Sequence, residues 1–259
     1  MNVRKYGNPP YNTILVHGGP GAAGSLKPVC EELSKDYGII EALQTKNTIK
    51  TQLEELKTIL KENASLPAIL VGHSWGAMLI FMFAANHPDL VSKIIMVSSG
   101  MLEVSYAQEI QINRQSKITP AQTKELEHLQ KLLQDSNHQN KNTLFPRMGQ
   151  IIEQVDTYKP IHLNYESELF NYEIFQSIWS EASLFRNSGA MLELGKSIKC
   201  DVVIIHGDYD SHPAHGIKSS IEKLNLNHRY YLLAKCGHTP WNEHYAKETF
   251  FDILKSELA

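Results

Sequence analysis

The segment from Ala68 to Pro88, AILVGHSWGAMLIFMFAANHP, constrains the fold more than any other part of the chain. Its first four residues are apolar and predict a short buried strand. The longer apolar run after Ser74 predicts a helix that ends near His87, because proline disfavours helical backbone in the residue before it. A serine at such a junction exposes its Oγ at the carboxyl end of the strand.

Two glycines bracket this serine. Gly72 and Gly76 are expected here because larger side chains would clash where the strand and the helix approach each other closely. The helix also directs its first amides toward the serine, and these favour developing negative charge. The pattern G-x-S-x-G in this setting predicts that Ser74 is a nucleophile.

Strands and helices alternate on both sides of this turn. Strands are predicted in the runs YNTILV, YGIIEAL, KIIMVSS, DVVIIHG and RYYLLAKC. Helices are predicted in LKPVCEELSKD, NTIKTQLEELKTILKEN, AHGIKSSIEKL and NEHYAKETFFDILKSEL, with Asn47 as the cap of the second. This alternation implies an α/β fold with a mostly parallel central sheet flanked by helices.

The pattern changes between Met101 and about Ala190. Gln, Asn, Lys and Glu dominate, and AQTKELEHLQKLLQD and ESELFNYEIFQSIWSEASLF predict helices without strands between them. We therefore expect a helical cap, residues 101–190, inserted into a core of residues 1–100 and 191–259. The cap holds eleven Asp and Glu against eight Lys and Arg, so the formal net charge of −3 lies on this segment.

The overall composition excludes several classes of protein. A net charge of −3 over 259 residues gives no electrostatic reason to expect nucleic acid or an anionic membrane as a partner. The longest apolar run, Ala77 to Ala85, is too short to span a bilayer, and MNVRKYGNPPYN lacks the apolar stretch of a signal peptide. We expect a cytoplasmic protein, with its oligomeric state left open.

A serine nucleophile needs a base, and the base needs an acid that orients it. In this architecture the three follow in the order Ser, Asp or Glu, His, each on a loop after a strand. Asp208 and Asp210 follow DVVIIHG, and His238 follows RYYLLAKCG. We predict His238 as the base and Asp210 as the acid, because the loop after Gly207 can carry this carboxylate over the strand end; Asp208 is the alternative.

The negative charge of a tetrahedral intermediate needs two amide donors. One is predicted at Trp75, directly after the nucleophile, and the other at Gly19 in the turn HGGPG. His17, Gly18 and His73 flank these positions, and we expect them to contact the substrate.

No metal or other cofactor is expected. The three cysteines are widely spaced and form no C-x-x-C pair. His206, Asp208, His212 and His215 are close in sequence, but His206 ends a predicted buried strand and the others share the loop of the predicted acid.

The segments HGGPG, GHSWG, GDYDSHP and CGHTPWNE together resemble the α/β-hydrolase superfamily, and within it the branch of proline iminopeptidases and related serine hydrolases. The resemblance covers about residues 13–99 and 200–258. Three features differ from that branch. Only sixteen residues precede HG, where an early strand pair is usual; EALQTKNT replaces a loop bearing glutamine and arginine; and His73 stands where those peptidases usually have glycine.

The resemblance implies a serine hydrolase that cleaves a small ester or amide through an acyl-enzyme intermediate. Trp179 to Glu181 is similar to the tryptophan–glutamate element with which proline iminopeptidases hold a substrate amine, so Glu181 is the candidate partner of an α-amino group. A proline iminopeptidase-like aminopeptidase is therefore one alternative. A non-catalytic protein of the same fold that binds a ligand is another.

Overall fold

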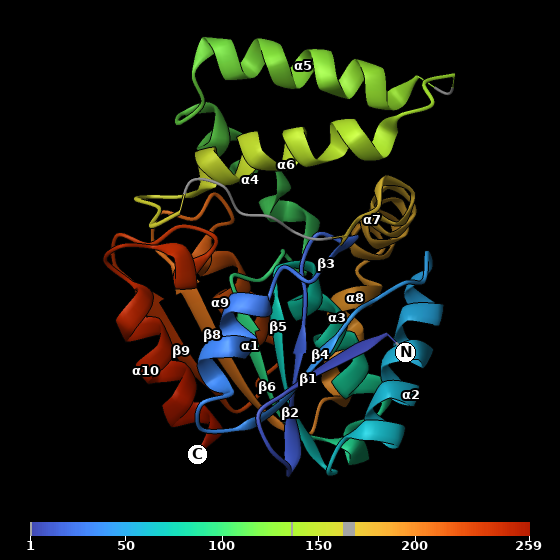
Figure 1. The fold of residues 1–259 in the computed structure, drawn as a ribbon, viewed down its shortest axis with the longest axis vertical. Helices are drawn as coiled ribbons and strands as arrows, with labels where there is room; N and C mark the ends of the chain where they lie inside the picture. Colours follow the sequence, from blue (N-terminus) through green and yellow to red (C-terminus); the bar gives the residue numbers. More distant parts are fainter. Residues whose placement is uncertain (1, 136, 163–168) are drawn as a thin grey trace.

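The computed structural model describes residues 2–135, 137–162 and 169–259. Its main feature is a seven-stranded sheet with the order β1-β4-β2-β5-β6-β8-β9 (Figure 1). The strands are β1 (Val3–Tyr6), β2 (Tyr11–Val16), β4 (Gly38–Ala42), β5 (Ala68–His73), β6 (Val91–Val97), β8 (Asp201–Gly207) and β9 (His228–Leu233).

All neighbouring strands of this sheet are parallel except β1, which pairs antiparallel with β4 at one edge. The predicted mostly parallel sheet is therefore confirmed. The sequence analysis missed β1, because its four residues are only partly buried and lack a clear apolar alternation. Parallel strands bring their carboxyl ends to one edge, so the turns after β2, β5, β8 and β9 lie together.

Helices cover both faces of the sheet. The helices α1 (Lys27–Leu33) and α10 (Lys247–Leu258) share one buried apolar cluster. The other face is covered by α2 (Ile49–Asn63), α3 (Trp75–Asn86), α8 (Ala190–Leu194) and α9 (Ala214–Lys223), which share a second cluster. Figure 1 shows α10 and α2 on opposite sides of the sheet.

Helix α3 lies at the centre of the second cluster. All eleven of its residues from Trp75 to Ala85 are buried, which explains why the apolar run after Ser74 has no polar face. The helix ends at Asn86, as the sequence predicts. One detail was wrong: the N-cap of α2 is Thr48, whose side chain accepts a hydrogen bond from the Thr51 amide, and not Asn47.

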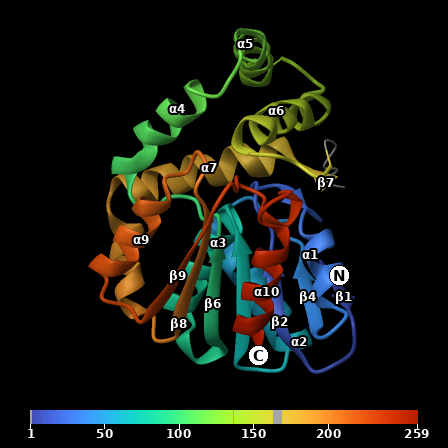
Figure 2. The same cartoon turned by 90° about the vertical axis from the view of Figure 1, so that its left-hand side faces the viewer.

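Four helices lie over the carboxyl ends of the strands: α4 (Ala107–Gln115), α5 (Pro120–Gln134), α6 (Lys141–Asp156) and α7 (Tyr172–Asn187) (Figures 1 and 2). Helices α5 and α6 pack through Leu126, Leu129 and Ile151. Helix α7 contributes Ile174, Ile178 and Ala182 to the cluster on the sheet. The start of the predicted segment ESELFNYEIFQSIWSEASLF, up to residue 168, lies outside the described residues.

A short antiparallel pair joins this layer to the sheet side. Strand β3 (Ala22–Ala23), just after the glycine turn, pairs with β7 (Leu169–Phe170). Among the described helices, none is both long and apolar enough to cross a membrane.

Candidate active site

Ser74 occupies the turn between β5 and α3 with φ 54° and ψ −113°, a backbone conformation that a non-glycine residue rarely adopts. A Cβ on Gly72 would lie 2.4 Å from the Gly76 carbonyl oxygen, and one on Gly76 would lie 2.0 Å from the Val16 carbonyl oxygen. The predicted need for glycine on both sides of the serine is confirmed. The serine side chain remains partly exposed.

The glycine turn after β2 lies against this serine. A Cβ on Gly18 would lie 3.1 Å from the Ser74 Cβ and 3.0 Å from His73 Nδ1. Gly19 is exposed and has φ +112°, a conformation that favours glycine. The Trp75 amide is the first of α3 and has no acceptor within the helix. Their role as oxyanion donors remains a prediction.

His17 has a different place from the one expected. Its side chain is fully buried, and its Nε2 accepts a hydrogen bond from the Gln44 amide at 3.1 Å. The proton must then be on Nδ1, which donates to the Gly18 carbonyl at 2.8 Å. Burial lowers the pKa of His17 to about 4. His17 therefore holds the glycine turn through the backbone. Its contact with a substrate stays a prediction, which this burial does not favour.

The predicted acid and base meet at the carboxyl ends of β8 and β9. Asp210 Oδ2 accepts a hydrogen bond from His238 Nδ1 at 2.7 Å. The alternative acid, Asp208, instead accepts the Cys236 amide at 3.2 Å and so joins the two loops. Burial alone would lower the pKa of His238, but the charge of Asp210 and the hydrogen bond to it raise the pKa above its ordinary value.

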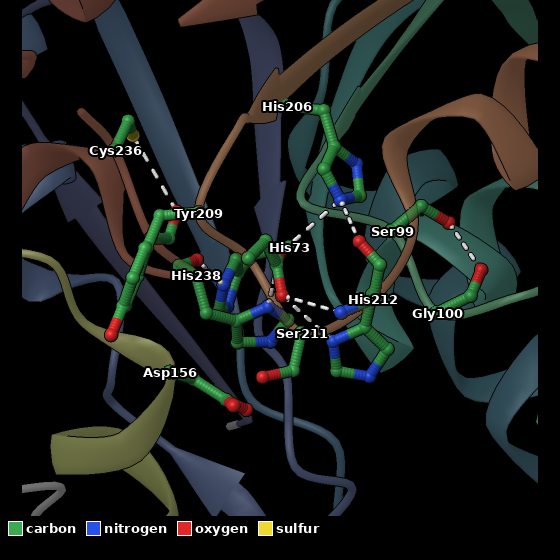
Figure 3. Close-up of polar contacts among 12 residues, drawn as sticks. His73, Ser99, Gly100, Asp156, His206, Tyr209, Ser211, His212, Cys236 and His238 are labelled. Carbon is green, nitrogen blue, oxygen red and sulfur yellow. Dashed lines mark hydrogen bonds and ion pairs between the residues drawn. The ribbon is translucent and has the colours of Figure 1, made fainter. Parts of the chain in front are cut away.

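Two further histidines surround Asp210. His212 donates to Oδ1 from its amide at 2.9 Å and from Nδ1 at 3.0 Å, and His206 Nε2 lies 3.3 Å from Oδ2. Figure 3 shows the rings of His206, His212 and His238 gathered in this region. Burial would raise the pKa of Asp210, but the His238 and His212 imidazoles and these hydrogen bonds hold it well below its usual range.

His73 links the serine turn to the base. Its Nε2 donates to the His238 carbonyl at 2.9 Å, and its ring lies 4.8 Å from the His238 ring, measured between centroids. Burial, reinforced by the charge of His238, lowers the pKa of His73 to about 3, so the ring is neutral. His73 thus precedes Ser74 in the sequence and contacts His238 in space. No hydrogen bond among the described residues joins Ser74 Oγ to His238.

The structure does not bring Glu181 to this group. Its carboxylate accepts the Ile49 amide at 2.8 Å and so stabilises the N-terminus of α2. It also lines a surface groove with residues of α2, α3 and α7, and the described lining of that groove includes none of Ser74, Asp210 and His238. The expected contact of Glu181 with a substrate amine stays a prediction, which this engagement does not favour.

Three residues that the sequence analysis did not single out hold His238, the predicted base, in place. The Asp156 carbonyl accepts the His238 amide at 2.8 Å, and its carboxylate pairs with Arg114 at 2.6 Å. Glu243 accepts the amides of Gly237 and Tyr158, both at 2.7 Å. Glu243 does stand in the motif CGHTPWNE, but Arg114 and Asp156 belong to α4 and α6 and no local pattern marks them.

One side-chain cluster has the composition of a metal site. Ligand atoms of Asp210, His212 and His238 lie within 4.8 Å of one another. The same atoms form the hydrogen bonds just described, which account for their proximity, and we assign no ion to them.

Comparisons with known proteins agree with this architecture. The family model described as alpha/beta hydrolase fold matches residues 19–244. A curated relative named proline iminopeptidase, from Lactobacillus acidophilus, is 34% identical over 103 residues, which is 33% of this chain and 35% of that protein. The match thus spans only about a third of the length of that relative.

Solved structures match over nearly the whole chain. An esterase from Exiguobacterium antarcticum superposes with a TM-score of 0.69 at 16% identity, covering 98% of this chain and 94% of that one. A monoacylglycerol lipase from Paleococcus ferrophilus gives a TM-score of 0.63 at 16% identity and covers 99% and 97%. At these identities the likeness shows the fold alone.

Proposed function

Because the chain belongs to the α/β hydrolase fold family, we propose that it is a serine hydrolase that cleaves a small ester or amide through an acyl-enzyme intermediate. The observation that carries the proposal is the 2.7 Å hydrogen bond between Asp210 and His238, formed beside His73, the residue before Ser74. A base oriented by a buried carboxylate next to a serine on a strained turn is the arrangement that nucleophilic acyl transfer requires.

In the proposed reaction Ser74 Oγ forms a bond to the substrate carbonyl carbon while its proton passes to His238 Nε2. Asp210 keeps the other ring nitrogen, Nδ1, protonated and stabilises the imidazolium. The imidazolium then protonates the leaving group as its bond to carbon breaks. In the second half of the reaction, water forms a bond to the acyl carbon while its proton passes to His238 Nε2. The bond from that carbon to Ser74 Oγ then breaks as Oγ takes the proton back from the imidazolium. The proposed reaction requires a hydrogen bond from the Ser74 hydroxyl to His238 when substrate binds; catalytic hydrogen bonds often tighten only in that complex.

The amides of Trp75 and Gly19 are the proposed donors to the oxyanion. The Trp75 amide begins α3, where the helix terminus favours negative charge. His17 fixes the glycine turn through its hydrogen bond to the Gly18 carbonyl. The same turn lies against Ser74, because a Cβ on Gly18 would contact the Ser74 Cβ. A donor held this firmly needs no reorganisation when charge develops.

A neutral acyl ester is the substrate class that these residues support best. The aminopeptidase alternative is favoured by the curated relative named proline iminopeptidase. However, the carboxylate that was expected to bind the amine, Glu181, is engaged by the α2 backbone.

Paired substrates test the proposal. We expect release of p-nitrophenol from p-nitrophenyl acetate and butyrate, with an initial burst from the acyl-enzyme, and no such release in Ser74→Ala. Cleavage of proline or alanine p-nitroanilide in preference to the esters would instead establish the aminopeptidase. Saturable ligand binding without turnover of either class would establish a binding protein.

A further inference from the structure

The Asp210 carboxylate is shared by two imidazoles, and each takes a separate oxygen. His238 Nδ1 lies 2.7 Å from Oδ2, and His212 Nδ1 lies 3.0 Å from Oδ1. The mechanism proposed above uses only the first of these bonds. The hydrogen bond from His212 to Oδ1 has no role in that mechanism.

His212 is built into the same unit as the base. Its ring stacks on the His238 ring with centroids 4.6 Å apart and an interplanar angle of 24°. Its carbonyl accepts a hydrogen bond from His206 Nε2 at 3.0 Å. The residue is buried, so its ring has little freedom to leave Asp210.

The hydrogen bonds define the proton positions. A carboxylate oxygen can only accept, so His212 Nδ1 carries a proton directed at Oδ1. Burial lowers the pKa of His212 even though Asp210 opposes this, so the ring is neutral near pH 7. A neutral donor orients the carboxylate without placing a second positive charge beside the imidazolium that forms on His238.

We propose that His212 is a positioning residue of the catalytic group: its Nδ1–H holds Asp210 Oδ1, so that Oδ2 stays directed at His238 Nδ1. This rests on the proposed function for its catalytic consequence, but the hydrogen-bond geometry that it describes exists without substrate. The His212 amide also binds Oδ1 at 2.9 Å, so the side chain adds to an orientation that the backbone begins.

Other charged and titratable groups also act on His238 and remain unchanged in the test. They come from α4, α6, β5 and the acid loop, and they are Arg114, Glu153, Asp156, His73 and Asp210. None of them is altered by substitution at position 212. The direct interaction of His212 with His238 is lost in every variant at this position, so the difference between a variant with the donor and one without it reports on the His212–Asp210 bond.

Two substitutions separate the donor from the ring. His212→Asn keeps an N–H group near the position of Nδ1 but removes the ring, whereas His212→Phe keeps a ring against His238 but removes the donor. Thermal unfolding and circular dichroism establish that each variant is folded. If the phenylalanine variant does not fold, His212→Ala serves as the donor-free protein.

The first readout is the pKa of His238, measured by NMR titration of its ring protons and assigned with a His238→Gln variant. Without the donor, Asp210 Oδ2 is less firmly directed at His238, so the interaction that raises the pKa of His238 is weaker. We expect the pKa to fall by about half a unit in His212→Phe and to stay near the wild-type value in His212→Asn. This measurement needs no turnover, so it decides the inference even if the proposed function fails.

The second readout is kcat/KM for p-nitrophenyl butyrate. We expect about a tenfold loss in His212→Phe and a much smaller loss in His212→Asn, because misplacement of a catalytic group lowers the rate while the backbone bond retains part of the orientation. An unshifted pKa in the donor-free variant, or equal effects of both substitutions, overturns the inference. Absence of turnover in the wild-type protein counts against the proposed function alone.

Discussion

The proposed nucleophile turn around Ser74 and the proposed acid–base loops, which carry Asp210 and His238, lie side by side but are stabilised in different ways. Ser74 is fixed by backbone packing, since the strand and helix around it leave no room for a Cβ at Gly72 or Gly76. His238 is fixed by hydrogen bonds from segments remote in the sequence: its amide bonds to Asp156 and its ring to Asp210.

This difference determines which part of the site responds to changes in the helices above the sheet. The proposed nucleophile turn rests on β2, β5 and α3 and on backbone hydrogen bonds of Ser74 with Val97 of β6 and with Gly100. None of these belongs to helices α4 to α7, so we expect changes in those helices to leave the turn intact. The base depends on these helices, because Asp156 ends α6 and is paired with Arg114 of α4. The proposed acid–base loops are therefore the part of the site that helices α4 and α6 can influence.

Removing the nucleophile should have the largest effect of all. Ser74→Ala deletes the attacking oxygen and leaves the backbone turn unchanged, so we expect kcat for ester hydrolysis to fall by about 10⁴- to 10⁶-fold. Steady-state kinetics measure the loss, and the melting temperature serves as the control, with little change expected. Retention of a substantial part of the wild-type rate would show that another group attacks.

The two aspartates should differ sharply. Asp210→Asn removes the acceptor that orients His238, and we expect a loss in kcat of about 10⁴-fold. Asp208→Asn changes only a contact to the Cys236 amide and should cost far less. Both variants are assayed with the same ester, and the reverse ranking would reassign the acid.

Substitution of Gly76 tests the steric side of the comparison. A methyl group there meets the Val16 carbonyl oxygen at 2.0 Å, so Gly76→Ala should lower the free energy of unfolding by about 1–3 kcal/mol or more. Gly149→Ala in α6 is the matched control, because its Cβ meets nothing within 4 Å and alanine favours a helix. Urea denaturation measures the free energy of unfolding of both variants. Equal values for Gly76→Ala and Gly149→Ala would contradict the claim that close packing fixes the turn at Ser74.

The pH dependence of the rate tests the hydrogen-bonded part of the site, Asp210 and His238. His238 must be neutral to accept the Ser74 proton, and its pKa is raised by Asp210. The rate should therefore be full above this raised pKa and fall about tenfold per pH unit below it, with the midpoint above about 6.5. A profile of kcat/KM against pH that is flat from about 5 to 8 would remove the general base.

The smallest effect is expected at Glu181. Its contact is the Ile49 amide, and glutamine keeps an acceptor oxygen there, so Glu181→Gln should cost less than about 1 kcal/mol of stability. The ratio of anilide to ester turnover should not change. A selective loss of anilide cleavage in this variant would restore Glu181 as an amine-binding residue.

The same contrast explains what could be predicted from the sequence. Gly72, Ser74 and Gly76 are close in the chain and their geometry follows from local sterics, so the turn was predicted in detail. The pairing of Asp210 with His238 followed from strand order. Arg114 and Asp156 were not found, because their contact depends on how α4 and α6 pack together.

Glu181 shows the converse case, in which a local pattern does not determine where the side chain lies. A tryptophan–glutamate pattern on a helix does not tell which side of the helix faces the substrate, and packing of α7 against α2 directs this carboxylate to the Ile49 amide. Likewise, His212 was visible in the sequence only as one of several histidines in a loop. Its bond to Asp210 depends on the folded loop.

The most direct test of the account is the site of covalent modification by a fluorophosphonate probe at neutral pH. A bond from Ser74 Oγ to phosphorus should form with loss of fluoride, and intact-mass and peptide analysis should find one adduct per chain, on the peptide that contains Ser74. Ser74→Ala should remain unmodified. An unmodified wild-type protein, or an adduct on a different residue, would contradict the assignment of Ser74 as the nucleophile.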